Sequence, residues 1–551
     1  MAEVEVEPRW LKSVHTHGLD HLGLQVVSIT MYGDLLPGLT NVTDRIRYYS
    51  FFPWILHRYA KDVRSTSLAK WREHLRRAEF LLALIGKWHH RDDSEGGEAV
   101  VGADQAKKVL DAMRSAPTKS WRLSKWTALA KAGEDGSYFA NRNGGYGQYY
   151  RSVLAELGLI TIEEKDPGVG LGPDLGVKIA ELCDVQPGRE EFWTAVRDDE
   201  VTLNLVEELG SHLCPCALTS FDEERAFLAN LMFGPDRTTG VNTRRRARSL
   251  RLLLAMLNQS DGVDDPVSEF RHVAYFGHTT AGRKYVAPPE LQHDLVKWLV
   301  YEASEFVHYS LEQAFLAVLA RLKTVTPKEA ALESFLPQLA QESLSASSTT
   351  LKLGRDKRPW SSRTLGDLLR EAEANQQPLA KNVDDPWGEM SLLPNPPEDA
   401  PLTVLARSLG CLLSVLARNL FPPKPFSFFE NLDTEFPKRY RVNLETVRDF
   451  VQKNLDTNAA AAYTDILSNW VLGQHIRVAM RKLRQQTQAT FKVAVEEGRY
   501  VWIEDFDPTF TNPRLRQAFR FLRDLGLCGG ATDGWRLRSA GKQILEVPDA
   551  K

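Results

Sequence analysis

Hydrophobic residues recur at helical spacing over most of the chain. In residues 68–90, 402–420 and several segments between 189 and 325, apolar side chains stand three and four positions apart, with polar side chains between them. This period predicts amphipathic α-helices. Strand-like patterns are short and lie near residues 160 and 535. We therefore predict a mainly α, multi-domain helical protein.

The C-terminal segment 515–546 combines a helical pattern with a hairpin pattern. Gly526 ends the helix, because a residue without Cβ takes the left-handed capping conformation at low cost. Two short strands around a Gly-Gly turn and a closing helix at 540–547 follow. Helix, hairpin and helix in this order predict a winged helix. The apolar face of its first helix is formed by Leu515, Ala518, Phe519, Leu522 and Leu525.

Residues 121–184 repeat this order and predict a second winged helix. A helix ending at Gly158 is followed by a strand at 160–164, a Gly-rich tip at 166–172 and a closing helix at 175–182. This copy is less basic, and winged helices also serve as protein-binding and dimerising modules. Its apolar helix face is expected to consist of Tyr149, Val153, Leu154 and Leu157.

Composition divides the 551 residues further. The stretch 341–400 is polar and rich in proline, which is typical of a linker or of long surface loops. The predicted divisions are an N-terminal helical domain with an aromatic core at 1–120, a winged helix at 121–184, a central helical domain at 185–340, the linker at 341–400, a helical domain at 401–498 and a C-terminal winged helix at 499–551.

Overall composition indicates a soluble protein of the cytoplasm. Apolar content is 43% and charged content 26%, both ordinary for a globular protein. No 18-residue apolar run and no apolar signal-peptide core occur, so we expect no membrane segment and no export. The five cysteines are scattered, which favours a reducing compartment over a disulfide framework.

Charge is distributed unevenly along the chain. The net charge is -3, but residues 477–542 hold 13 Lys and Arg against 7 Asp and Glu, which leaves the remainder at -9. A local basic region predicts an anionic partner such as DNA, and a solvated helical face is the alternative. A second basic cluster, 237–251, has six arginines and no acid. The candidate nucleic-acid-binding residues are Arg516, Arg520, Arg523, Arg536, Arg538, Lys542, Arg477, Arg481, Arg484, Arg244, Arg245, Arg246 and Arg248.

The N-terminal segment 36–59 is dense in aromatic residues. Arg45 and Arg47 beside Tyr48 and Tyr49 could stack on bases or bind phosphate. Such a segment more often forms a buried core in which arginines bond to carbonyls or carboxylates. We expect the core interpretation to hold.

The same segment carries a family resemblance. LLPGLTNVTDRIRYYSFFPWI resembles the N-terminal signature of a group of uncharacterised bacterial proteins, in which Pro-Gly, Arg-x-Arg-Tyr and Phe-x-Pro-Trp follow in that order. The match covers roughly the first 60 residues. Members of that group are often carried in genomic islands with restriction and anti-phage genes. The resemblance implies a bacterial setting and a role in genome defence, and it carries no catalytic residue over.

Metal and cofactor patterns along the chain are weak. His89, His90, Asp92 and Asp93 are residue types that bind metals, but their spacing matches no known ligand pattern. His212, Cys214 and Cys216 lie close together, but Cys-Pro-Cys lacks the two-residue gap of a zinc knuckle, which favours a packing role. Walker A, Gly-x-Ser-x-Gly and His-Glu-x-x-His motifs do not occur. We expect no bound metal or nucleotide cofactor and assign no catalytic residue.

Three functional interpretations follow. We favour a non-enzymatic DNA-binding scaffold or adaptor subunit of a bacterial multi-protein system, with DNA and other protein subunits as partners. A metal-dependent nuclease subunit of such a system is the second, because catalytic residues need not be close in sequence. A purely protein-binding winged-helix adaptor is the third.

Overall fold

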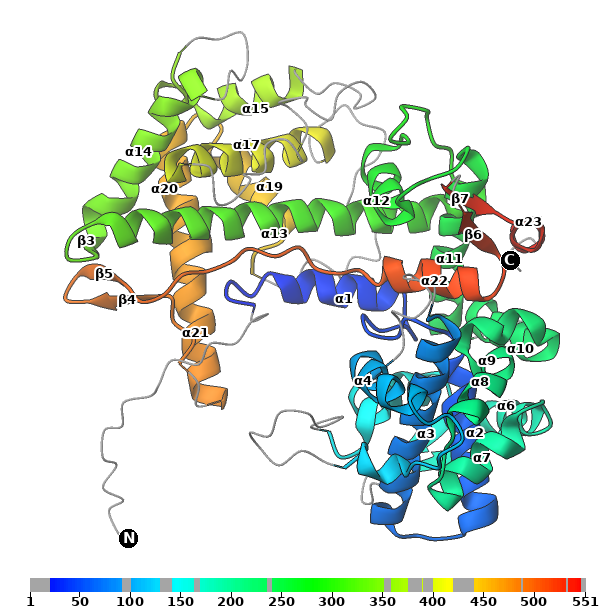
Figure 1. Cartoon of the computed structure of the whole chain (residues 1–551). Helices are drawn as coiled ribbons and strands as arrows, with labels where there is room; N and C mark the ends of the chain where they lie inside the picture. The colour runs from blue at the N-terminus through cyan, green and yellow to red at the C-terminus, as the bar shows by residue number, and fades with distance from the viewer. Residues whose placement is uncertain are drawn as a thin grey trace, which may run out of the picture. The chain divides into compact units, whose positions relative to one another are not determined.

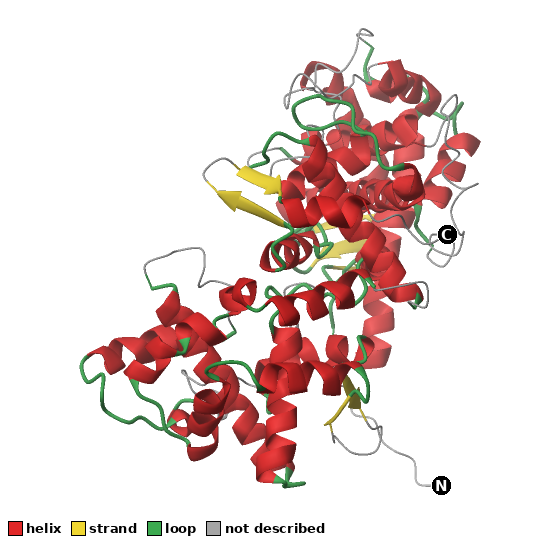
Figure 2. Cartoon of the chain, turned by 90° about the vertical axis from the view of Figure 1, so that its right-hand side faces the viewer, coloured by secondary structure: helices red, strands yellow, loops and turns green. Residues whose placement is uncertain are grey.

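The structure is a computed structural model in which helices dominate and strands are few and short (Figure 2). It describes residues 20–91, 101–128, 141–162, 169–234, 240–350, 358–374, 389, 400–419, 441–486, 489–531 and 534–546. The prediction of a mainly α protein is therefore confirmed.

The chain forms two compact units, each built from segments that are distant in sequence. The α13 unit comprises Met1–Gly33 and Glu269–Thr511, and the α2 unit comprises Asp34–Ser268 and Asn512–Lys551. The first and last predicted domains thus both contribute to the α2 unit. Two of the three boundaries in the chain fall within helices, α1 (Gln25–Leu35) and α12 (Pro266–Phe276), and the third lies between Thr511 and Asn512.

The α13 unit is organised around its longest helix. α13, Gln292–Thr324, has 33 residues and spans about 50 Å at 1.5 Å per residue. α17, Pro401–Asn419, lies alongside it (Figure 1). Besides α1 and α12, the other described helices of the unit are η5 (Pro289–Leu291), α14 (Leu332–Thr350), η6 (Trp360–Ser362), α15 (Leu365–Ala374), α19 (Leu444–Lys453), α20 (Ala459–Ile466), η7 (Leu467–Leu472) and α21 (Gly473–Gln486).

α17 is long and apolar enough to cross a membrane by length and composition. It is the one described helix with this property, and 72% of its apolar window is buried inside the structure. Its partners are α13, α14 and α15. In this fold its apolar residues are core residues.

A small antiparallel sheet completes the α13 unit. Its strand order is β3 (Glu329–Ala331), β5 (Arg499–Trp502) and β4 (Val493–Glu496), with Tyr500 opposite both Ala330 and Val495. β4 and β5 are joined by Glu497 and Gly498, both at positive φ. Glycine takes that conformation without strain, which permits the tight turn.

The region predicted as a linker, 341–400, is partly helical. α14 continues to Thr350, and η6 and α15 occupy much of 360–374. Leu344, Leu365 and Leu368 are buried, so these polar stretches still contain an apolar helix face. Glu389 is also buried, and its carboxylate accepts hydrogen bonds from the Tyr275 hydroxyl (2.6 Å) and the Arg418 guanidinium (2.8 Å). Residues 351–357, 375–388 and 390–399 lie outside the described residues.

The α2 unit is built around the aromatic helix α2, Tyr48–Arg58. Ten of its eleven residues are buried, among them Phe51, Phe52 and Trp54, which confirms that the segment is structural core. The helices around it are η1 (Tyr59–Val63), α3 (Leu68–His89), α4 (Ala103–Arg114), η2 (Leu123–Lys125), α7 (Arg189–Asp198), α8 (Leu203–Glu208), α9 (Gly210–Leu213), η4 (Pro215–Ser220), α10 (Asp222–Phe233) and α11 (Val241–Gln259).

The first predicted helix–hairpin–helix segment has the expected order. It consists of η3 (Tyr146–Tyr150), α5 (Arg151–Glu156), β1 (Ile160–Ile162), β2 (Val169–Leu171) and α6 (Leu175–Asp184). Residues 163–168 lie outside the described residues, and β2 occupies 169–171, which the sequence pattern assigned to the Gly-rich tip. Tyr149, predicted in the apolar face, is not part of the buried face. η3 is a π-helical turn, whose wider spacing rotates the side chains, so that Tyr146 and Tyr150 are buried and Tyr149 is half-buried.

The C-terminal segment has the same order and packs on α11. α22 (Leu515–Asp524) is followed by the antiparallel strands β6 (Cys528–Ala531) and β7 (Gly534–Leu537) and by α23 (Ser539–Glu546). The Gly-Gly pair predicted as the turn, Gly529 and Gly530, lies within β6 and pairs with Arg536 and Trp535. The predicted apolar face of α22 is buried, as expected. Phe521, Gln517 and Asp524 are buried as well, because a second side of the helix packs on residues 41–49.

Candidate nucleic-acid interface and metal-ligand cluster

Four predicted cations of the C-terminal segment lie at the surface. Arg516 is exposed on α22, on the side opposite the buried Phe519. In β7 the side chains alternate, so that Trp535 packs edge-on against Phe519 (5.9 Å between ring centroids) and Arg536 is exposed. Arg538, which directly precedes α23, and Lys542, in the first turn of α23, are exposed too. Among the described residues no ion pair involves any of the four cations Arg516, Arg536, Arg538 and Lys542.

The other two cations of this segment are engaged within the protein. Arg520 forms an ion pair with Asp44 at 2.7 Å, and its side chain is only 16% exposed. The guanidinium of Arg523 lies 5.7 Å from the ring centroid of Trp535, in a cation–π arrangement. Arg516, Arg520 and Arg523 therefore are not three equivalent surface charges, although they stand at the regular i, i+4, i+7 spacing of one helix face.

The arginines at the start of α11 also differ from one another in burial and in their partners. Arg246 is fully buried and donates to the carbonyls of Pro37 (3.0 Å), Leu231 (2.6 Å) and Met232 (3.1 Å). Its assignment as a nucleic-acid-binding residue is wrong, because a buried guanidinium cannot reach a phosphate. Arg245 lies 3.5 Å from Asp34, and Arg248 is half-buried.

Arg244 alone of these four is exposed. Arg237, at the beginning of the basic cluster, lies outside the described residues.

α21 in the α13 unit carries a continuous basic face. Arg477, Arg481 and Arg484 are all exposed at the predicted i, i+4, i+7 spacing, and within the described part of the chain none of them is in an ion pair. The opposite face of α21 is apolar and buried through Val478 and Ala479. The sequence pattern therefore identified both faces of this helix.

Arg45 and Arg47 are structural. Arg45 lies 2.9 Å from Asp524, and Arg47 lies 3.1 Å from Glu224 and donates to the Cys214 carbonyl at 2.8 Å. All four side chains of these two ion pairs are buried. The alternative in which these arginines stack on bases is excluded, since neither guanidinium reaches the surface.

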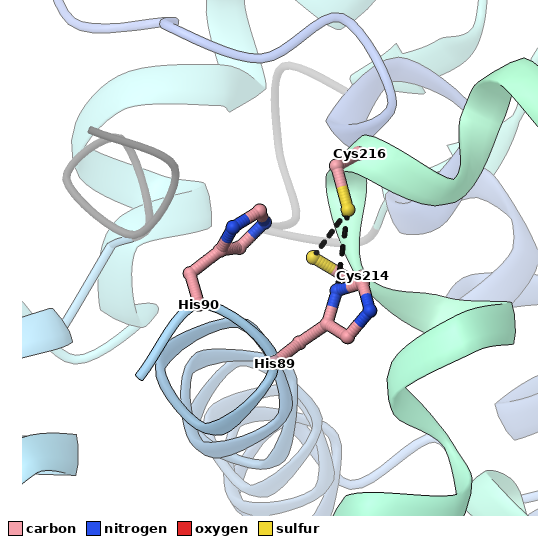
Figure 3. A group of neighbouring side chains, drawn as sticks. All are labelled: His89, His90, Cys214 and Cys216. Atoms are coloured by element: carbon pink, nitrogen blue, oxygen red, sulfur yellow. Dashed lines mark hydrogen bonds between the residues drawn. The ribbon is translucent and has the colours of Figure 1, made fainter. Parts of the chain in front are cut away.

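A second group of functional side chains comes from two distant segments of the α2 unit. His89 and His90 lie at the end of α3, and Cys214 and Cys216 lie on the facing segment (Figure 3). Their ligand atoms all lie within 4.8 Å of one another. The Cys216 sulfur is 3.3 Å from His89 Nδ1 and 3.2 Å from the Cys214 sulfur.

Local backbone geometry brings each pair of ligands to the same side. α3 ends at His89, and His90 leaves helical geometry (φ -105°, ψ 29°), so the two rings are not held at the helical angle of 100° per residue. Cys214 ends α9 in an extended conformation, and Pro215 then begins η4. Because the chain turns at this point, the two sulfurs converge.

The two thiols differ in acidity because they are hydrogen-bonded to each other. The hydrogen bond between the two sulfurs lowers the pKa of the Cys216 thiol, and the neighbouring His90 and His89 add to this effect, whereas burial opposes it. The same hydrogen bond, together with burial, raises the pKa of Cys214. Cys216 is therefore the more acidic of the two thiols.

Comparison with known proteins adds no candidate residues. No protein-family model, curated protein or solved structure gives a significant match to the chain, so its function is inferred from its own residues.

Sequence spacing does not reveal the His–Cys group, because its two halves lie in distant segments of the chain. His89 and Cys216 are 127 positions apart, and each pair alone lacks a ligand pattern. His212, which is adjacent in sequence to Cys214, is not one of the four, and Asp92 and Asp93 lie outside the described residues. The available signal was the presence of two separate pairs of ligand-type residues.

Proposed function

We propose that the protein is a non-enzymatic nucleic-acid-binding subunit, with duplex DNA as its ligand. The observation that carries this proposal is a set of exposed basic side chains that are not engaged in ion pairs within the described part of the protein. Eight of the thirteen candidates are exposed and, among the described residues, outside any ion pair: Arg516, Arg536, Arg538, Lys542, Arg477, Arg481, Arg484 and Arg244.

Such residues suit a phosphate backbone. An exposed guanidinium or ammonium group loses little by exchanging water for a phosphate oxygen, and the release of condensed counterions favours binding. Arg516, Arg536, Arg538 and Lys542 belong to one short segment within 27 residues of one another along the chain, which supports a common ligand.

We interpret the segment α22–β6–β7–α23 as a winged helix, and α5–β1–β2–α6 as a second one. In the C-terminal copy the presented helix is partly covered, since Arg520 is paired with Asp44. The expected contacts with DNA therefore come from Arg516 at the start of α22, from the hairpin through Arg536, and from the start of α23. Such contacts to phosphate give affinity and orientation rather than sequence preference.

The cellular setting in this proposal comes from the N-terminal signature. We place the protein in the bacterial cytoplasm as a subunit of a multi-protein system for genome defence. Most of the signature segment is buried in the α2 unit, so it supports a shared fold rather than a shared binding surface.

The test measures binding of a fluorescently labelled duplex by anisotropy over a series of salt concentrations. The quadruple variant Arg516→Ala, Arg536→Ala, Arg538→Ala, Lys542→Ala should bind more weakly than the parent on every duplex sequence. Each lost phosphate contact removes about 0.9 from the slope of log K against log salt, so four should flatten it by roughly 3–4 units.

The matched control removes the same charge elsewhere on the α2 unit. Lys107, Lys108, Arg122 and Lys125 are also exposed, and their replacement by Ala should leave the slope near that of the parent. Equal weakening by both quadruple variants would mean that net charge alone attracts DNA. Absence of binding at low salt would favour the protein-binding adaptor, and Mg²⁺-dependent cleavage of the duplex would favour the nuclease.

A further inference from the structure

We infer that His89, His90, Cys214 and Cys216 bind one zinc ion, which joins the end of α3 to the α9–η4 segment. This inference is independent of DNA binding. It rests on four ligand-type side chains, from two separate segments, that converge on one point (Figure 3).

The spacing of the ligand atoms fits a single tetrahedral ion. With Zn–S near 2.3 Å and Zn–N near 2.0–2.1 Å, tetrahedral geometry separates ligand atoms by roughly 3.3–3.8 Å. The sulfur–sulfur distance is 3.2 Å, the Cys216–His89 distance is 3.3 Å, and no pair in the group exceeds 4.8 Å. Adjustments of about 0.5–1 Å, within the reach of side-chain rotation, would complete the coordination.

The donor set selects the metal and its role. Two thiolates and two imidazoles form the Cys₂His₂ set typical of structural zinc, whereas carboxylates and carbonyls would suit magnesium or calcium. Four protein ligands fill a tetrahedral shell and leave no position for a reactive water. The site is therefore structural and does not support a hydrolytic reaction.

The surroundings hold the ligands in place. A Cβ at Gly210 would lie 3.1 Å from the His89 ring, so the absence of a side chain there lets the ring lie close against α9. The Cys214 carbonyl accepts from the buried Arg47 at 2.8 Å, and Arg47 is itself paired with Glu224. Supporting contacts of this kind orient metal ligands. Cys214 is fully buried and His89 is exposed, which leaves a route for the ion.

The expectation of a metal-free protein is revised on this basis. That expectation depended on ligand spacing along the chain, and a site made of two pairs in distant segments has no such spacing. Zinc would cross-link segments 124 or more positions apart, so its binding free energy contributes directly to the stability of the α2 unit.

The experiment uses the full-length chain, purified with a non-chelating reductant and dialysed against zinc and then against metal-free buffer. Elemental analysis should give about one zinc per chain. Cys214→Ser, Cys216→Ser and His89→Ala should each weaken zinc binding at least about tenfold, since even loss of a supporting contact weakens metal affinity roughly 10–100-fold.

Two controls test specificity: His212→Ala removes a histidine next to the cluster, and Cys183→Ser removes a buried thiol outside it. Both should keep the zinc.

A spectroscopic measurement on the parent protein avoids dependence on how the variants fold. Cobalt(II) added to the zinc-free parent should produce the intense d–d bands of tetrahedral coordination and a thiolate charge-transfer band, both displaced by zinc. The inference is overturned if the reduced parent takes up no zinc and shows no cobalt spectrum. It is also overturned if His212→Ala loses the ion while His89→Ala retains it, or if mass spectrometry finds a Cys214–Cys216 disulfide that persists under reduction.

Discussion

The guanidinium of Arg45 lies 2.9 Å from the carboxylate of Asp524, although 479 positions separate them in the chain. Both side chains are almost fully buried. The same carboxylate also accepts from the backbone N–H of Ile46 at 3.4 Å. The pair fastens the N-terminal aromatic segment to the end of α22, and Tyr49 against Phe521 adds an edge-to-face contact at 5.3 Å.

Breaking this pair should destabilise the α2 unit strongly. Arg45→Met and Asp524→Leu should each lower the free energy of unfolding by roughly 3–5 kcal/mol, because each leaves one buried charge without its partner. The double variant should be more stable than either single variant, since both charges are gone. Urea denaturation measures all three, with Arg516→Ala as an exposed control expected within about 0.5 kcal/mol of the parent. Additive losses in the double variant would show that the two charges are not coupled.

Substitutions of Arg246 and Arg244 should have different effects, although the two residues are only two positions apart. Arg246→Ala removes the donor for three buried carbonyls, and hydrogen bonds from a charged group contribute about 1.5–3 kcal/mol each. We expect a loss of at least about 3 kcal/mol in unfolding free energy with little specific effect on the salt dependence of DNA binding. Arg244→Ala should leave stability unchanged and affect only binding. If Arg244→Ala lowered stability and Arg246→Ala affected only binding, the side chains at the start of α11 would be arranged differently.

Phe52 is a central residue of the aromatic core of the α2 unit. It is 2% exposed and packs against Tyr48 and Tyr150, with ring centroids 5.6 and 4.9 Å away. Phe52→Ala should cost roughly 3–5 kcal/mol, seen as a lower melting temperature. Leu175→Ala, at a position 40% exposed on α6, is the control and should change it little. An unchanged melting temperature with lost function in Phe52→Ala would instead identify a binding surface.

A buried histidine should make the stability of the α13 unit fall at alkaline pH. His308 lies 3.0 Å from Glu312 and 3.3 Å from Glu305 on α13. Burial by itself lowers the pKa of His308, but the two carboxylates outweigh it and raise the pKa to about 10. A pKa raised above the unfolded value of about 6.5 contributes stability that is complete below about pH 6.5 and is lost as pH rises through 10.

The urea midpoint should therefore decrease between about pH 7 and 10 in the parent. His308→Gln cannot be protonated, so its midpoint should be lower at pH 7 and should change less over this range. Parallel pH profiles for the two proteins would show that His308 is not charged in the folded state.

Thr509 and Thr511 link this cluster to the segment before α22. Their backbone N–H groups donate to Glu312 (2.9 Å) and Glu305 (2.7 Å). Changes at His308 should therefore also increase hydrogen exchange at these two amides, which mass spectrometry can resolve.

Local periodicity determined which segments are helical and which of their faces are apolar. Leu515, Phe519 and Leu522 are buried as their spacing indicated, and the exposed arginines of α21 stand where the pattern placed them. Helix, strand and turn preferences act between residues a few positions apart, so the sequence alone contains this information. The helix–hairpin–helix order at both predicted positions follows from the same kind of signal.

Tertiary structure alone decided what each charged or metal-binding side chain does. Arg516, Arg520 and Arg246 look alike in the sequence, yet one is exposed, one is paired with Asp44 and one is buried among carbonyls. His89 acquires Cys216 as a neighbour only because α3 and α9 pack together. Burial, pairing and ligand geometry depend on contacts between distant segments, and a pattern read along the chain does not contain those contacts.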